Sequence, residues 1–163
     1  MTQLALKHLS KSFGAFKVLD DLSLDVKSGE IVVIFGGSGT GKTILLRLIA
    51  GVEEPSAGSI EIDGHDISDV APEHRGVGMA FQNFALFPHM SAAENIATPL
   101  YAQAASAEGV KAGVDRVAKL LKISHVLGHA PRELSNGQKQ RTALARALAA
   151  EPRILLLDDP LRN

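Results

Sequence analysis

The chain has 163 residues, of which 45% are hydrophobic and 21% charged, and its formal net charge is −1. This length supports one domain with a core of its own, and the near-neutral charge argues against a nucleic-acid surface that depends on bulk positive charge. The absence of cysteine excludes disulfides and thiolate metal sites, and every apolar run is far shorter than the about 18 residues of a membrane span.

The first third of the chain predicts strands, a glycine-rich loop and one helix. Short β-type stretches are expected at residues 4–9 and 22–26, and the continuously apolar residues 31–35 predict a strand buried on both faces. Residues 43–50 predict a helix that ends at Gly51. The buried face of this helix is expected to carry Leu45, Leu48 and Ile49.

Strand signals continue until helices take over in the middle of the chain. Residues 59–63 and 77–81 predict two further strands, and Asp63-Gly64 predicts a turn. Ser91 and Glu94 form the capping-box pattern that opens a helix.

Helical patterns fill the remainder of the chain up to a last strand. A second helix is expected from apolar residues at helical spacing, namely Val110, Val114, Val117 and Leu121. Ser135 with Gln138 predicts the start of a third helix, which stops before Pro152. Residues 154–157 predict a buried strand. This order of elements indicates an α/β core that carries a mostly helical subdomain.

The strongest local signal is the glycine-rich segment 36–43, which matches the pattern G-x-x-x-x-G-K-[ST] in full. Glycines let the backbone curl so that its N–H groups, together with the start of the following helix, face phosphate groups. We expect Lys42 to reach the β- and γ-phosphates of ATP and the Thr43 hydroxyl to ligate Mg²⁺. The alternative is an ordinary glycine-rich turn. The residues expected to bind are Gly36, Gly37, Ser38, Gly39, Thr40, Gly41, Lys42 and Thr43.

A second candidate is Asp158, which follows the apolar residues 154–157. P-loop ATPases use a carboxylate at the end of such a strand to hold the magnesium shell. Many buried strands end in an acidic residue, so Asp158 becomes informative only together with the phosphate loop. The pair predicts an ATP-Mg²⁺ site.

Residues 134–141 read Leu-Ser-Asn-Gly-Gln-Lys-Gln-Arg, which resembles the LSGGQ signature of ATP-binding-cassette ATPases. A capped helix start would by itself explain Ser135 and Gln138, but the free N–H groups of a helix start also favour phosphate. The resemblance implies that Ser135, Gly137 and Gln138 cap the γ-phosphate held by the opposite subunit of an ATPase dimer. Asn136 stands where the family has the first signature glycine.

The resemblance extends over essentially the whole chain and implies further binding residues. Phe13 resembles the aromatic residue that stacks on adenine, with Val18 beside the ribose, although a lone phenylalanine is more often a core residue. Gln82 resembles the loop glutamine that contacts Mg²⁺ and the attacking water, although an isolated glutamine after a strand is usually only a polar loop residue. The implied metal-binding residues are Thr43, Gln82 and Asp158.

Asp159 occupies the position at which the family usually has its catalytic glutamate, the general base that polarises the attacking water. Aspartate is one methylene shorter, and a misplacement near 1 Å lowers a rate on the order of 100-fold. We therefore expect Asp159, with Gln82 as the second catalytic residue, to support slow but nonzero hydrolysis in the intact parent protein.

Residues 84–96 are similar to ATPases that serve solute importers, especially the sugar and glycerol-phosphate group and the polyamine importers. The resemblance implies that the region from Gln82 to Ile96 receives transmembrane permease subunits, although Phe84, Leu86 and Phe87 could instead fill a core. It further implies a homodimer or heterodimer of ATPase subunits on the cytoplasmic side of the inner membrane. An extracytoplasmic solute-binding protein would take part indirectly, and no nucleic acid is expected.

The implied fold is a P-loop NTPase (RecA-like) α/β core with a mixed sheet and a helical subdomain insertion, incomplete at the C-terminus. We expect the core at residues 1–85 and 152–163 and the helical subdomain at about 86–151. Two alternatives to a transport ATPase remain. One is a hydrolytically inactive nucleotide-binding fragment. The other is a soluble, non-transport ATPase of the same family acting on DNA or ribosomes, against which the near-neutral charge stands.

Overall fold

A computed structural model describes residues 2–160. Met1 and residues 161–163, which belong to the expected core, lie outside the described residues. The chain divides into two compact units, Met1–Arg75 and Gly76–Asn163, and each is described by itself. The bounds expected for the helical subdomain stay a prediction.

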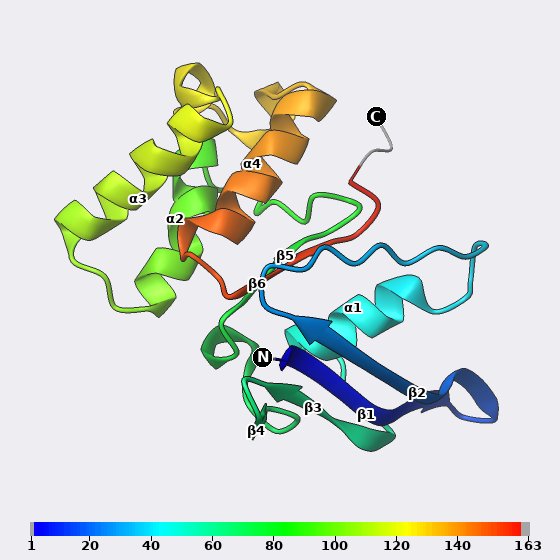
Figure 1. The fold of residues 1–163 in the computed structure, drawn as a ribbon. Coiled ribbons are helices and arrows are strands. Elements are labelled where there is room, and N and C mark those ends of the chain that lie inside the picture. Colours follow the sequence, from blue (N-terminus) through cyan, green and yellow to red (C-terminus); the bar gives the residue numbers. More distant parts are fainter. Residues whose placement is uncertain (1, 161–163) are drawn as a thin grey trace. The chain divides into compact units, whose positions relative to one another are not determined.

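The first unit contains a four-stranded antiparallel sheet with the strand order β2–β1–β3–β4 (Figure 1). Its strands are β1 (Thr2–Phe13), β2 (Phe16–Lys27), β3 (Ala57–Ile62) and β4 (His65–Asp66). The strands predicted at 4–9, 22–26 and 59–63 are thereby confirmed, and the first two are longer than predicted. Leu4 of β1 pairs with Val26 of β2 and with Ile62 of β3, so β1 lies between these two neighbours.

Helix α1 (Lys42–Ala50) belongs to the same unit and ends at Gly51, as predicted. Gly51 has a left-handed backbone with φ 80°, and its N–H closes the last turn on the carbonyls of Arg47 and Leu48. The three apolar residues expected on the inner face of the helix are all buried. Spacing of apolar residues and a terminal glycine therefore located this helix correctly.

Arg75 satisfies backbone carbonyls in the interior of the first unit. It follows the short 3₁₀ helix η1 (Pro72–His74) and is only 6% exposed. Its guanidinium donates to the carbonyls of Leu48 at 3.0 Å, Val70 at 2.7 Å and Ser68 at 2.8 Å. Burial lowers the pKa of this group. A single side chain thus ties the end of α1 to the segment after β4.

Residues 31–35 contradict the prediction of a strand buried on both faces. They form no strand, and Ile31 and Phe35 are 90% and 92% exposed. An apolar run becomes a buried strand only where other strands accept its backbone hydrogen bonds and a second layer covers its side chains. Within residues 2–160 no strand pairs with this segment.

The second unit combines a parallel strand pair with three α-helices. Strand β5 (Val77–Ala80) pairs with β6 (Ile154–Leu157) (Figure 1). The register places Ala80 opposite Leu157. Both strands were predicted. In β6, however, Leu156 alone is buried, whereas Leu155 and Leu157 are 38% and 40% exposed, because β5 is its only partner among the described residues.

The helices of the second unit are α2 (Ala92–Ala102), α3 (Ala107–Leu120) and α4 (Asn136–Ala149), with the 3₁₀ helices η2 (Ser124–Val126) and η3 (Pro131–Glu133) between the last two. The capping boxes predicted at Ser91 and Ser135 are both confirmed. Apolar residues of all three helices form one core, whose fully buried members include Ile96, Val117 and Ala145. None of the helices within residues 2–160 has both the length and the apolar character that a membrane span requires.

Candidate functional site

The phosphate loop lies in the first unit, where residues 36–41 lead into the N-terminus of α1. Gly39 and Gly41 have φ values of 79° and 90°, in the left-handed region that favours glycine. A side chain on Gly41 would also lie 3.0 Å from Cγ1 of Val18 and 3.2 Å from the carbonyl oxygen of Val18. The last glycine of the pattern is therefore required both by the turn and by close packing against β2.

Lys42 folds back over this loop. Its Nζ donates to the carbonyl oxygens of Gly36 at 2.8 Å and Gly37 at 2.6 Å. The Thr40 hydroxyl donates to the Gly37 carbonyl at 3.0 Å and lies 3.4 Å from Nζ. The ammonium group, the exposed loop backbone and the start of α1 are thus gathered at one place, which is the arrangement that an anionic phosphate needs.

The two residues expected to contact the adenine and the ribose belong to strands of the same unit as this loop. Phe13, at the end of β1, is 46% exposed, and the ammonium of Lys11 lies over its ring, 4.8 Å from the centroid. The alternative that Phe13 is a core residue is therefore wrong. Val18 is half-buried and packs against Gly41, as described above. Stacking on adenine itself stays a prediction.

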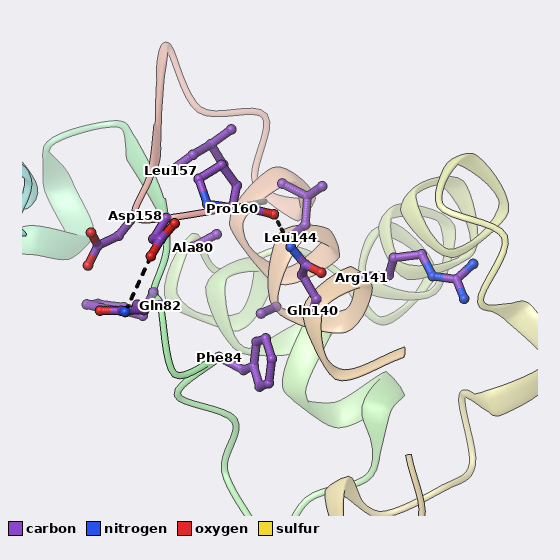
Figure 2. Close-up of a pocket in the computed structure, with 12 residues that line it drawn as sticks. Ala80, Gln82, Phe84, Gln140, Arg141, Leu144, Leu157, Asp158 and Pro160 are labelled. Carbon is purple, nitrogen blue, oxygen red and sulfur yellow. Dashed lines mark hydrogen bonds between the residues drawn. The ribbon is translucent and has the colours of Figure 1, made fainter. Parts of the chain in front are cut away.

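The acidic candidates lie in the second unit, at the carboxyl ends of the parallel strand pair. Asp158 follows β6 directly, is 8% exposed, and its N–H donates to the Ala80 carbonyl at 3.0 Å. Gln82 follows β5, and its Nε2 lies 3.5 Å from Oδ2 of Asp159 (Figure 2). Because parallel strands deliver their carboxyl ends to the same edge, three of the residues expected to support hydrolysis come together.

These side chains border a cavity of about 470 Å³ that helix α4 closes on the other side (Figure 2). The side chain of Gln140, from α4, donates to the carbonyl of Pro160. Figure 2 shows Gln82 and Asp158 at one end of this space and Gln140 and Arg141 at the other. The residues that line the cavity are Ala80, Phe81, Gln82, Phe84, Gln140, Arg141, Ala143, Leu144, Leu157, Asp158, Asp159 and Pro160.

The signature-like segment forms the N-terminus of α4. The Ser135 hydroxyl accepts from the Gln138 N–H at 3.3 Å, and Oε1 of Gln138 accepts from the Ser135 N–H at 2.8 Å. Ser135 and Gly137 are exposed, and a side chain added at Gly137 would meet nothing within 4 Å. The capping role is thus confirmed. The hydroxyl proton of Ser135 is not used by the cap and can still be donated to an anion.

Two residues that the sequence analysis did not single out hold the loop between β5 and α2. The Asn95 side chain, fully buried, accepts from the Phe87 N–H at 2.8 Å and donates to the carbonyl oxygens of Phe87 and Met90. Arg146 of α4 donates to the carbonyl oxygens of Phe84 and Ala85. A polar residue at an inward position of an apolar helix was the available signal for Asn95, whereas nothing local marks Arg146.

No group of three or more histidine, aspartate or glutamate side chains capable of holding a metal is gathered anywhere in residues 2–160. Mg²⁺ does not require such a group, because it is commonly held by one or two carboxylates, water and the phosphates of a bound nucleotide. The buried carboxylate of Asp158, in the second unit, and the hydroxyl of Thr43, in the first, are each a type of group that binds Mg²⁺ in proteins.

Comparison with known proteins identifies the family. The family model described as ABC transporter matches residues 19–162. The chain belongs to the ABC transporter family. The resemblance noted in the sequence is thereby confirmed, and the fold is that of an ABC ATPase cassette, a P-loop NTPase with mixed sheets and helices.

Individual members of the family show how far the similarity extends. The maltose/maltodextrin import ATP-binding protein MalK of Salmonella typhimurium is 44% identical over 163 residues, which are 100% of this chain and 44% of that protein. The spermidine/putrescine import ATP-binding protein PotA of Chromobacterium violaceum is 47% identical over 161 residues, 99% of this chain and 45% of that protein. The chain therefore spans less than half the length of these relatives.

Among solved structures, a dimeric post-hydrolysis state of the ATP-binding cassette MJ0796, bound to ADP and Pi, matches with a TM-score of 0.88. It is 34% identical, and the match covers 98% of this chain and 75% of that cassette. At this identity the likeness supports the family assignment as well as the fold.

Proposed function

We propose that this chain binds ATP-Mg²⁺ and that, within a protein of the length of its relatives (here called the full chain), it hydrolyses ATP as the ATP-binding subunit of an ABC importer. The observation that carries the proposal is the phosphate loop. Lys42 lies over a glycine-rich loop at the start of α1, with its ammonium group within hydrogen-bonding distance of two loop carbonyls. The similarity to the importer subunits MalK and PotA supports the transport role.

The roles of the binding residues follow from their chemistry. The loop N–H groups and Lys42 would bind the phosphates, Phe13 would stack on adenine, and Val18 would border the ribose. Residues that would hold the metal are Thr43, Gln82 and Asp158; the bound Mg²⁺ would neutralise charge on the phosphate oxygens. In a dimer of such subunits, Ser135, Gly137 and Gln138 would meet the γ-phosphate bound by the partner.

The region from Gln82 to Ile96 is the proposed surface for permease subunits, which would place the chain peripherally on the cytoplasmic face of the membrane. Phe87 is 42% exposed, so at least one of the aromatic residues of this region is available to a partner rather than filling a core. The solute is proposed to be a carbohydrate, in line with MalK, although PotA serves polyamines. A solute-binding protein would act only through the permease.

The first test is binding of a fluorescent ATP analogue with Mg²⁺ to this chain and to Lys42→Ala. Loss of a charge-assisted hydrogen bond of about 1.5–3 kcal/mol should weaken binding about 10- to 100-fold. Lys7→Ala is the matched control, because Lys7 is an exposed β1 lysine paired with Glu61 on the sheet. Equal affinity of folded wild type and Lys42→Ala would overturn the proposed phosphate site.

A second candidate function is nucleotide binding without useful hydrolysis, which Asp159 favours. Its short carboxylate lies 3.5 Å from the Gln82 amide, and its backbone is left-handed with φ 51°. If Asp159 is a poorly placed general base, Asp159→Glu should raise the hydrolysis rate of the full chain on the order of 100-fold, and Asp159→Asn should lower it. An unchanged rate in Asp159→Glu would rule out the short side chain as the limiting factor.

A further inference from the structure

Arg146 joins helix α4 to the loop that follows Gln82. Its Nη1 donates to the Ala85 carbonyl at 2.7 Å and its Nη2 to the Phe84 carbonyl at 3.0 Å. The guanidinium carbon also lies 5.6 Å from the centroid of the Phe87 ring. The planar fork of one arginine therefore contacts three residues of a loop that is 61 residues away in the sequence.

The two carbonyls that Arg146 binds belong to residues in an unfavourable conformation. Phe84 and Ala85 have φ values of 63° and 46°, in the left-handed region that residues with a Cβ atom rarely adopt. Two such residues in succession persist only where surrounding groups hold them. The local hydrogen bonds, Phe84 N–H to Phe81 and Ala85 N–H to Asn83, leave both carbonyls to Arg146.

The other end of the loop is held independently. Asn95 binds both backbone groups of Phe87 and the carbonyls of Met90 and Ser91 from within α2. Asn95 therefore fixes the loop from residue 87 onward, whereas Arg146 fixes residues 84 and 85, next to Gln82. Of the hydrogen bonds described within residues 2–160, those of Arg146 join α4 to the residues that follow Gln82.

We propose that Arg146 is a positioning residue for Gln82: by holding the carbonyls of Phe84 and Ala85, it fixes the loop so that the Gln82 amide points toward Asp159. This inference rests on the proposed function where it concerns hydrolysis, because Gln82 and Asp159 are the residues proposed to orient the attacking water. The Arg146 contacts also couple helix α4, which follows Ser135, to the loop that contains Gln82. A change in the loop that breaks the Arg146 contacts would then alter the orientation of the Gln82 amide.

The first test measures the loop itself and needs no nucleotide. Backbone amide exchange of Phe84 and Ala85, whose N–H groups hydrogen-bond within the loop, is compared in wild type, Arg146→Met and Arg146→Lys. Methionine keeps an unbranched stem and removes both donors, so we expect these amides to exchange at least about tenfold faster, since they exchange from locally opened states. Lysine keeps the charge but not the fork, and should restore part of the protection.

Arg116→Met is the matched control, because Arg116 of α3 likewise donates to a backbone carbonyl, that of Ala149 at 3.0 Å, in the same unit. It should leave exchange of Phe84 and Ala85 unchanged. Exchange within α4, at residues 140–145, should stay the same in all variants. Unchanged loop exchange in Arg146→Met, or an equal loosening of α4, would overturn the role of Arg146 in holding the loop.

The second test is ATP hydrolysis by the full chain, analysed as kcat and KM separately. Because Gln82 is proposed to orient the attacking water, Arg146→Met should lower kcat about tenfold with a smaller change in KM, and Arg146→Lys should recover part of kcat. Faster loop exchange with an unchanged kcat would overturn the positioning of Gln82. If wild type fails to bind ATP-Mg²⁺, the proposed function fails and the hydrolytic role with it, while the exchange result still decides whether Arg146 holds the loop.

Discussion

At the scale of single residues, Gly51 and Arg75 depend on one another. Gly51 ends α1 with φ 80°, and a Cβ atom placed on it would lie 2.5 Å from Nε and 2.7 Å from Cζ of Arg75. That guanidinium is buried and satisfies carbonyls at the end of α1 and after β4. The glycine is therefore needed for two reasons, its backbone conformation and the space it leaves for the arginine.

We expect Gly51→Ala to lower the free energy of unfolding by about 2–4 kcal/mol, since it adds left-handed strain and disturbs buried hydrogen bonds of Arg75. Gly64→Ala is the control, because Gly64 has nearly the same φ, 78°, but a Cβ atom placed on it would meet nothing within 4 Å. It should lower the free energy by only about 1–2 kcal/mol. Urea unfolding of both variants measures the difference, and equal losses would contradict the role of Arg75.

At the scale of elements, the two capping boxes differ in one chemically useful way. In the box of α2, Glu94 accepts hydrogen bonds from the backbone N–H and the hydroxyl of Ser91, and these bonds lower the pKa of Glu94 below its ordinary value of 4.5. In the box of α4 the same position is Gln138, which does not titrate. The start of α2 should therefore respond to acid, whereas the start of α4 should not.

The direction of the pH effect follows from the lowered pKa of Glu94. Its contribution to stability is complete above the unfolded pKa of 4.5 and is lost as pH falls through the lower folded pKa. Amide exchange of residues 92–95 should accelerate in that acid range relative to residues 137–140. Glu94→Gln, which keeps the box without a titrating group, should remove the difference; if it persists in that variant, another group is responsible.

Helices and strands also differ in how well the sequence predicted them. The start of α4 was predicted from Ser135 and Gln138, because a cap is made between residues three apart. Residues 31–35 were wrongly predicted as a buried strand, because burial of a strand depends on partners elsewhere in the chain. The phosphate loop was recognised because its pattern lies within eight consecutive residues. Arg146 was not recognised, because the carbonyl that it binds lies 61 residues away in the sequence.

At the scale of the whole molecule, the loop proposed to bind the phosphates and the residues proposed to orient the attacking water belong to different compact units. The phosphate loop belongs to the first unit, while Gln82 and Asp159 belong to the second. Because Lys42 is proposed to bind the phosphates and Arg146 to position Gln82, Lys42→Ala should mainly weaken nucleotide binding, whereas Arg146→Met should mainly lower kcat.

The exposed segment 31–35 makes a last prediction about the behaviour of the chain in solution. It reads Ile-Val-Val-Ile-Phe, with no charge and no proline, and Ile31 and Phe35 are 90% and 92% exposed. Short apolar segments of high β-propensity with free backbone groups pair readily with copies of themselves. We therefore expect this chain to self-associate as its concentration rises, and the double variant Ile31→Lys/Phe35→Lys to stay monomeric over the same range, because charges on the segment oppose pairing.

Sedimentation velocity over a series of concentrations measures this self-association. Leu120→Lys is the matched control, since Leu120 is also an exposed apolar residue, at 65%, but stands at the end of α3 outside any long apolar run. Isolated exposed apolar residues are normal on protein surfaces, so this control should associate as wild type does. Association of the double variant at wild-type strength would show that another surface joins the copies, and a monomeric wild type would show that the segment does not pair despite its exposure.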